Sequence, residues 1–268
     1  MLKAYLDRGV KGSSTDNIAC VACTVFKENS YKQFVRPWNR MLRRWGASAF
    51  HATDFYPGGG EFERKTAERK RWFDRDSREI PKIIGENVHR ILAVAFRPEE
   101  YAAMASQEWK DRFGTDTHAI AVQLCLVFNG LWLQEKRSTE YFAYVREAGD
   151  EGEGAVDEAV RKLGTNPEYA RVIRVTSYKT VDKGNARGTE ASDFVAWHWN
   201  KYAVETFPAG RPPRKDFIAL AQLTEARGKV QSAFITGDKL RIFFDTLERE
   251  VRHKLRSSDA NEKDKTAQ

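Results

Sequence analysis

Several features that would assign the chain to a familiar class are missing from its 268 residues. Only three cysteines occur, which excludes a disulfide-stapled scaffold and favours free buried thiols in a reducing compartment. No run of about 18 apolar residues is present, so nothing in the sequence predicts a membrane span. A carboxylate, Asp7, stands where a signal peptide needs an apolar segment, and we therefore expect a cytoplasmic protein.

The sequence also lacks the common short motifs of phosphate-binding and hydrolytic sites. The glycine run 58–60 continues into neither a P-loop nor a dinucleotide fingerprint, and no serine-hydrolase elbow or zinc-peptidase His-Glu-x-x-His occurs. Cys20 and Cys23 fit a Cys-x-x-Cys pattern, but they lie in an expected strand, where residues three apart point to opposite faces. We interpret both as core thiols.

Basic residues outnumber acidic ones, with 45 Lys and Arg against 38 Asp and Glu and a net charge of +7. Aromatic residues make up 12% of the chain, and disordered and collagen-like classes are excluded by this composition. A positive balance suits a polyanionic partner, so we expect nucleic acid, DNA or RNA, as the main partner. A protein partner stays open, and no membrane partner is expected.

Apolar strand-like segments alternate with helical ones along the chain, which is typical of a mixed α/β sheet flanked by helices. Strands are expected at 2–7, 18–26, 89–96, 141–147 and 171–178. Helices are expected at 31–45, 98–106, 117–134, 154–163, 190–204, 214–226 and near 238–255. We predict one domain over 1–252, with a helical insertion at about 98–137, and a flexible charged tail over 253–268.

Four carboxylates stand among apolar neighbours. Asp7 and Glu147 end two expected strands, Asp54 lies in the short apolar segment 50–55, and Asp193 interrupts an apolar helix. Burying a charge is costly unless something compensates it. Each acid alone fits a cap, a turn or an ion pair. Together they match the carboxylates that hold Mg²⁺ or Mn²⁺, and two such ions can clamp a phosphodiester.

Four short blocks, in this order, resemble the domain of unknown function 3800 family. They are Tyr5-Leu6-Asp7, Phe50-His51-Ala52-Thr53-Asp54-Phe55, Glu147-Ala148-Gly149-Asp150 and Glu190-Ala191-Ser192-Asp193-Phe194-Val195-Ala196-Trp197. The resemblance covers roughly residues 3–205. It implies a ribonuclease H-like fold and an acidic site of Asp7, Glu147 and Asp193 with Asp54 nearby. The family has no single established activity.

Two positions depart from the family pattern. Asp7 is followed by Arg8, Gly9 and Val10, where the family has a second acid or related residue and then Ser-Gly. Arg8 would contact a phosphate or compete with a metal for the carboxylate. Glu190 stands where the family has Gln, and because it shares a helix face with Asp193 it would add a metal ligand.

Substrate contacts are expected from residues around the Asp193 helix. Lys179, Lys183 and Arg187 lie in the segment that leads into this helix, and Asn200 lies further along it. The three basic side chains and Arg8 would contact phosphates, and Asn200 would contact a base or sugar. Trp197 and His198 are expected to pack in the core. The alternatives are contact with a base or sugar for Trp197, and a role as proton carrier or ligand for His198 and His51.

Three functions follow from this pattern. The favoured one is a metal-dependent nuclease or phosphodiesterase with Asp7, Glu147 and Asp193 as catalytic residues and Mg²⁺ or Mn²⁺ as cofactor. The second is a ribonuclease H-like module that binds nucleic acid or assembles with a partner but has lost turnover. The third is a phosphohydrolase of small nucleotides.

Overall fold

The computed structural model describes residues 1–9, 18–63, 71, 74, 78–149, 152–182, 184–206, 208, 210–225, 230–234, 240–241 and 244–245. Val10, Lys183, most of the segment 238–255 and the whole tail 253–268 lie outside these residues. The expectations for them therefore stay predictions.

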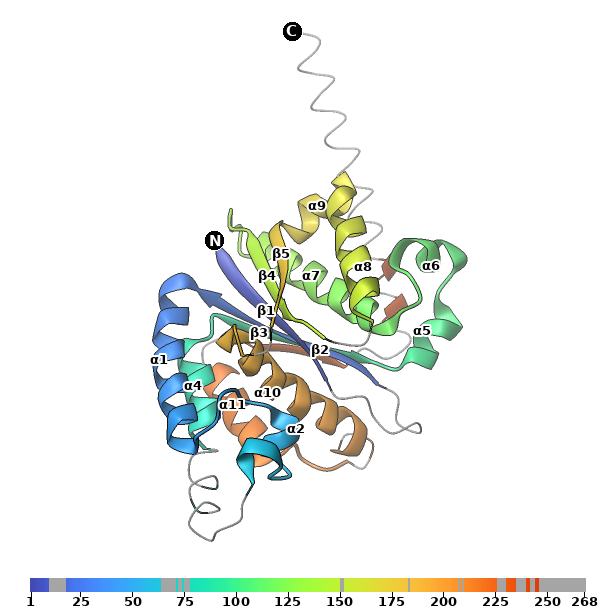
Figure 1. Ribbon diagram of the computed structural model, residues 1–268. Helices are drawn as coiled ribbons and strands as arrows, with labels where there is room; N and C mark the ends of the chain where they lie inside the picture. Colours follow the sequence, from blue (N-terminus) through green and yellow to red (C-terminus); the bar gives the residue numbers. More distant parts are fainter. Residues whose placement is uncertain are drawn as a thin grey trace.

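A mixed sheet of six strands forms the centre of the described structure, in the order β5-β4-β1-β2-β3-β6 (Figure 1). The strands are β1 Leu2–Arg8, β2 Ala19–Lys27, β3 Arg90–Phe96, β4 Phe142–Glu147, β5 Val175–Val181 and β6 Val230–Phe234. β2 runs antiparallel to β1 and β3, whereas β4 is parallel to β1, β5 to β4, and β6 to β3. The expected α/β class, a mixed sheet flanked by helices and consistent with a ribonuclease H-like fold, is confirmed.

Both faces of the sheet are apolar because helices cover both. On β2, Val21 and Val25 pack into the core on one face, while Ala22 and Phe26 pack into the core on the other. Alternating side chains that are buried on both sides give near-continuous apolar strands. This is why the central strands were readable from the sequence as short apolar runs.

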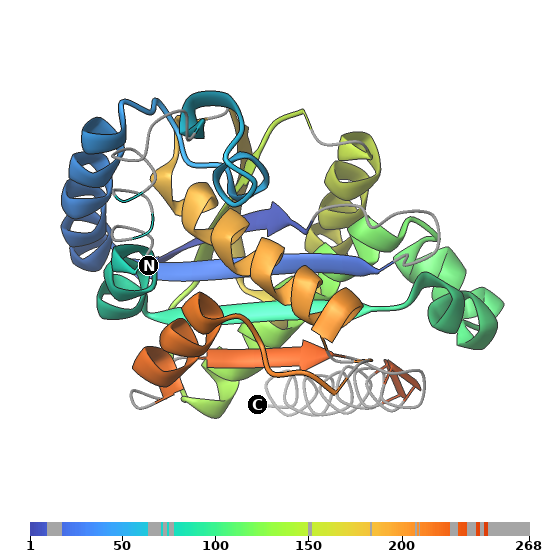
Figure 2. The same cartoon turned by 90° about the horizontal axis from the view of Figure 1, so that it is seen from below.

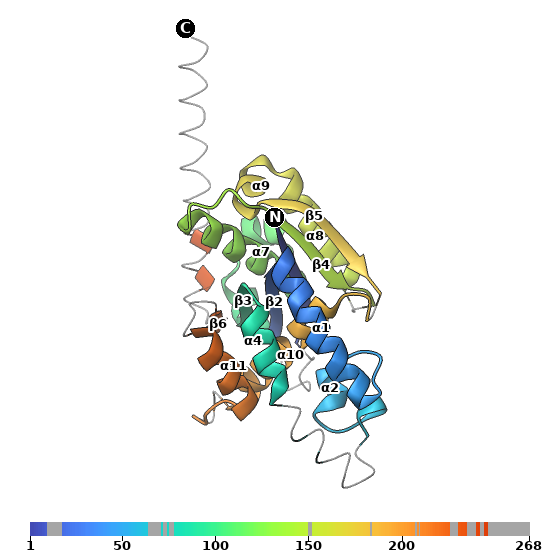
Figure 3. The same ribbon diagram turned by 90° about the vertical axis from the view of Figure 1, so that its left-hand side faces the viewer.

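The helices form one layer on each face (Figures 1 and 3). One layer contains α1 Glu28–Trp45, α2 Ala52–Phe55, α4 Glu79–Asn87, α10 Arg187–Lys201 and α11 Lys215–Glu225. The other contains α5 Pro98–Met104, α6 Gln107–Phe113, α7 Thr117–Glu135, α8 Glu153–Thr165 and α9 Pro167–Ile173. Figure 2 shows α10 crossing the strands obliquely. No helix among the described residues is long and apolar enough to span a membrane.

The expected insertion at about 98–137 divides into two parts. Asp116 caps α7 by accepting a hydrogen bond from the Ala119 N–H at 2.8 Å. α7 is buried around most of its circumference and packs on β2 and β3. It is therefore a layer of the core, and only α5 and α6 form an excursion at the edge.

The segment expected as a strand at 171–178 begins as a helix. The Asn166 side chain accepts a hydrogen bond from the Glu168 N–H at 2.9 Å, and Pro167 occupies the first turn, so α9 starts here and runs to Ile173. Arg174 then takes a left-handed conformation with φ 50°. This residue ends the helix, and β5 begins one residue later.

Candidate functional site

Asp7 and Glu147 lie side by side at the ends of two parallel strands. The register that pairs Leu6 with Arg146 places Asp7 next to Glu147. Side chains alternate along a strand, and Tyr5, two residues before Asp7, packs in the core under α10. Both acids therefore project toward α10, and both are partly exposed. The carboxyl ends of parallel strands are where open α/β sheets bind ligands.

α10 is held against this part of the sheet by a buried polar contact and by a glycine. Ser192 Oγ donates to the Tyr5 carbonyl at 2.7 Å and lies 2.8 Å from Thr24 Oγ1. A Cβ on Gly188 would stand 2.3 Å from the Tyr5 ring, so only glycine allows the helix to approach this closely. The position of α10 over β1 and β2 is thereby fixed.

α10 brings Asp193 to the side of the helix that faces Glu147. Thr189 Oγ1 lies 3.3 Å from Glu147 Oε2, and Asp193 is one helical turn further on. Asp193 Oδ2 accepts a hydrogen bond from the Ala52 N–H at 2.8 Å and lies 3.8 Å from His51 Nδ1. The side chains of His51 and Asp193 are 18% and 16% exposed. The arrangement orients the imidazole and leaves the pair in reach of a ligand.

The predicted metal ligands fit a hard cation by chemistry, but the three acids are not gathered into one cluster. Asp7, Glu147 and Asp193 supply carboxylate oxygens, the donors that Mg²⁺ and Mn²⁺ take. Within the part of the chain that the structure describes, no three Asp, Glu, His or Cys side chains are gathered to hold a metal ion. A cation on this face of the sheet would therefore be held by Asp7 and Glu147, the two acids on adjacent strands.

Glu190, the expected additional ligand, is instead an internal acceptor. Its Oε2 accepts hydrogen bonds from Trp38 Nε1 at 2.6 Å and from the Phe50 N–H at 3.2 Å, and its Oε1 accepts one from Arg187 Nη1. The residue is 1% exposed. Burial raises the pKa of this carboxyl, and the three donors oppose that rise. The side chain anchors α10 to α1 and to the segment before α2.

Arg187, the expected phosphate contact, donates hydrogen bonds to other residues of the protein. Besides its ion pair with Glu190, its Nε donates to Asn39 Oδ1 at 2.8 Å and its Nη1 donates to the Ser48 carbonyl at 3.0 Å. Its side chain is 22% exposed. The predicted ligand and the predicted substrate arginine are thus partners of each other.

Asp54 lies in α2 and faces the glycine loop that follows. Its backbone carbonyl accepts hydrogen bonds from Gly58 N and Gly59 N, at 3.0 and 2.8 Å. Its Oδ2 would be 3.6 Å from a Cβ on Gly60. These contacts place Asp54 beside the turn that closes α2, which is a structural position.

Arg8 projects from the opposite face of the sheet to Asp7, because consecutive residues of a strand alternate. The positive charge of Arg8 is one of the causes, after burial, that lower the pKa of His118 on α7 to about 4. Arg8 therefore lies on the α7 side, away from Asp7, Glu147 and Asp193.

Two of the remaining predicted contacts, Lys179 and Asn200, lie on different elements. Lys179 is exposed on the edge strand β5, opposite Val145, and so projects on the α10 side. Asn200 is 4% exposed, and its Cβ would stand 3.1 Å from a Cβ on Gly9. Asn200 therefore packs α10 against the end of β1. Lys183 lies outside the described residues.

A hollow of about 410 Å³ beside Asp193 was not predicted. Its walls come from α2 and the turn after it, from α10, and from the residue before α11. They are Thr53, Tyr56, Pro57, Trp197, Lys201, Glu205 and Arg214. Trp197 was expected to pack in the core, with contact to a base or sugar as the alternative, and Tyr56 and Arg214 are distant in the sequence. No local pattern relates them.

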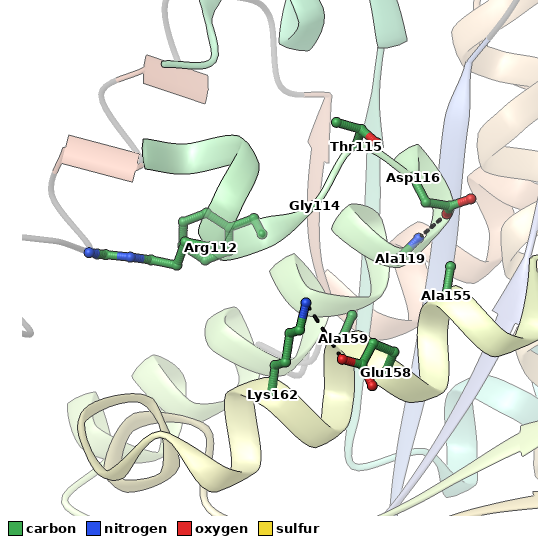
Figure 4. Close-up of a pocket in the computed structure, with 10 residues that line it drawn as sticks. Arg112, Gly114, Thr115, Asp116, Ala119, Ala155, Glu158, Ala159 and Lys162 are labelled. Atoms are coloured by element: carbon green, nitrogen blue, oxygen red, sulfur yellow. Dashed lines mark hydrogen bonds and ion pairs between the residues drawn. The ribbon is translucent and has the colours of Figure 1, made fainter. Parts of the chain in front are cut away.

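A second hollow, of about 210 Å³, lies in the layer that contains α7, between α8 and the connection from α6 to α7 (Figure 4). Asp116 points to the Ala119 N–H there, and Lys162 forms an ion pair with Glu158 at 3.5 Å. This hollow is on the α7 side of the sheet, so it belongs to a different face from Asp7 and Asp193.

The sequence matches no protein-family model and no curated protein.

Proposed function

We propose that the chain is a metal-dependent nuclease that hydrolyses nucleic-acid phosphodiesters on the α10 side of the sheet. The observation that carries this proposal is the adjacency of Asp7 and Glu147 at the carboxyl ends of β1 and β4, on the side of the sheet where α10 carries Asp193. The resemblance to the domain of unknown function 3800 family implies the same three acids and supports the proposal.

The chain's own residues supply three functions to such a site. Asp7 and Glu147 provide paired negative charge for a cation. A bound Mg²⁺ or Mn²⁺ would activate water and stabilise the leaving oxygen. His51, held 3.8 Å from Asp193, is placed to hold or move a proton. Lys179, exposed on the same side of the sheet, attracts the polyanion.

The test is cleavage of labelled single-stranded DNA, duplex DNA, RNA and an RNA·DNA hybrid, each with Mg²⁺, Mn²⁺ or chelator. The wild type is compared with Asp193→Asn and with Asp111→Asn, a matched change at an exposed acid of α6. We expect metal-dependent cleavage that is lost in Asp193→Asn and kept in Asp111→Asn. Equal activity in both variants contradicts the assignment, and activity on free nucleotides alone favours the small-nucleotide alternative.

A second function, nucleic-acid binding without turnover, is favoured by the bonds that two helix acids make. Glu190 and Asp193 accept hydrogen bonds from the backbone of Phe50 and Ala52, two alternate residues of one segment. These hydrogen bonds hold the segment 50–52 against α10. A protein that binds nucleic acid without cleaving it would also need them. Binding that persists in chelator, falls steeply with salt and leads to no cleavage supports this alternative.

A further inference from the structure

The unpredicted hollow beside Asp193 combines an aromatic wall with cationic side chains. The rings of Tyr56 and Trp197 are stacked, with centroids 4.0 Å apart and planes at 10°. The guanidinium carbon of Arg214 lies 4.9 Å from the Trp197 ring centroid and 5.3 Å from that of Tyr56. Rings and a guanidinium at these distances stabilise one another by cation–π attraction.

The wall is firmly positioned. Tyr56 Oη lies 2.5 Å from His198 Nε2, which is buried in α10, and 3.4 Å from Asp216 Oδ2. Burial raises the pKa of the Tyr56 hydroxyl, so the ring stays neutral. Trp197 is only 5% exposed, and its ring lies behind the ring of Tyr56, on which it stacks. Of the two stacked rings, a ligand in the hollow therefore meets mainly that of Tyr56.

The hollow shares its walls with the acid site. Trp197 follows Asp193 by one helical turn on α10, a rise of about 6 Å. Thr53 follows Ala52, whose N–H bonds Asp193. A chain of nucleotides that passes Asp193 along α10 therefore reaches the hollow next.

We propose that the hollow binds one unpaired nucleotide of a single-stranded nucleic acid, with the base against Tyr56 and a phosphate on Arg214. Proteins that bind single strands combine a positive groove with aromatic rings on which bases stack. Lys201, which pairs with Glu205 at 2.5 Å, also lines the hollow. The volume is within the range of small-ligand sites. This binding site rests on the proposed nuclease function in one respect only, which is that Asp193 is taken as part of the neighbouring cleavage site.

Binding is measured by fluorescence anisotropy, in chelator, so that no cleavage is required. The probes are a labelled thymidine oligonucleotide of about 12 nucleotides, an abasic strand of the same length and a matched duplex. The variants are Arg214→Ala and Tyr56→Leu, with Arg211→Ala as a control at an exposed arginine nearby that does not line the hollow.

We expect Arg214→Ala and Tyr56→Leu each to weaken single-strand binding about tenfold, and Arg211→Ala to change it less than twofold. Tyr56→Leu should leave abasic-strand binding unchanged, because that strand has no base to stack. Tyr56→Phe keeps the ring and should restore binding. If Tyr56→Leu does not fold, Arg214→Ala against Arg211→Ala decides the question.

The proposal is overturned by equal single-strand affinity in Arg214→Ala and Arg211→Ala, or by a wild type that binds no single strand. The same is true of an equal loss on the duplex. The nuclease proposal fails separately, in the cleavage assay with Asp193→Asn. Loss of binding in Arg214→Ala without any cleavage by the wild type supports the hollow and contradicts the nuclease.

Discussion

Asp193 on α10 accepts a hydrogen bond from the backbone N–H of Ala52, the first residue of α2, at 2.8 Å. Three residues earlier, Glu190 accepts one from Phe50. The two acids accept hydrogen bonds from alternate backbone N–H groups of the segment 50–52, as a neighbouring β-strand would. α2 carries the turn with Tyr56, so the helix that presents the candidate catalytic acid also positions the wall of the hollow.

This relationship predicts that Asp193→Asn and Asp193→Ala differ in stability while both lose activity. Asn keeps an acceptor for the Ala52 N–H, whereas Ala leaves that donor without its bond. We expect Asp193→Ala to lower the free energy of unfolding by about 1–2 kcal/mol more than Asp193→Asn does. Denaturant unfolding of both variants measures the difference, and equal midpoints would show that the bond does not hold α2.

The close approach of α10 to β1 predicts a large effect of one methyl group. Gly188→Ala places a Cβ 2.3 Å from the Tyr5 ring, so helix and sheet must separate. We expect a loss of about 3 kcal/mol in unfolding free energy, with loss of any activity that needs Asp193 over Asp7. Thermal or denaturant unfolding and the cleavage assay give the two readouts.

Gly164→Ala in α8 is the matched control, because nothing lies within 4 Å of its Cβ position. Alanine has the higher helix propensity, so this variant should be stabilised by about 0.5 kcal/mol. A Gly188→Ala protein as stable as Gly164→Ala would contradict the packing of α10 on Tyr5.

The sequence was most informative where one local rule was sufficient. Apolar runs bounded by polar turns predicted β1 to β4, and an apolar segment preceded by Asp116 predicted α7. At 171–178 the same rule failed. A capping asparagine, Asn166, followed by a proline starts a helix there, and apolar content alone does not separate a short helix from a strand.

The site was less predictable because burial depends on distant residues. Arg187 and Glu190 are three apart, a spacing that fits an ion pair, a phosphate contact or a metal ligand equally well. The role of Glu190 is set by Trp38 and Phe50, which both donate hydrogen bonds to its buried carboxylate. The face of Arg8 followed from strand alternation alone, and in that case the structural signal was present in the sequence.

Because they lie on different faces of the sheet, two basic residues are predicted to contribute differently to nucleic-acid binding. Lys179 projects on the α10 side and Arg8 on the α7 side. We expect Lys179→Ala to reduce the salt dependence of nucleic-acid binding by about one unit of slope, and Arg8→Ala to leave that slope unchanged. Binding titrations at several salt concentrations test this. A slope that changes in Arg8→Ala and not in Lys179→Ala would place the nucleic acid on the α7 side.

His198 predicts a loss of stability in mild acid. It is 1% exposed, and burial, with the charge of Arg214 as a smaller cause, lowers its pKa from 6.5 to about 3. Its surroundings supply the Tyr56 hydroxyl and the rings of Phe194, Trp197 and Phe217. The imidazole therefore stays neutral in the folded protein at a pH where the unfolded chain takes up a proton.

The direction of the effect follows from proton binding. Below pH 6.5 the unfolded state binds more protons than the folded state, so the free energy of unfolding falls as the pH falls toward 3. Between pH 7 and pH 5 the difference in His198 protonation lowers the free energy of unfolding by about 2 kcal/mol. In His198→Gln the fall over this range should be smaller by that amount, measured by denaturant unfolding at each pH. Tyr56→Phe, which removes the partner hydroxyl but keeps the imidazole, should retain the wild-type fall. A His198→Gln protein with an unchanged pH dependence would mean that the imidazole is also protonated in the folded state. It would contradict the prediction that His198 stays neutral beneath the hollow.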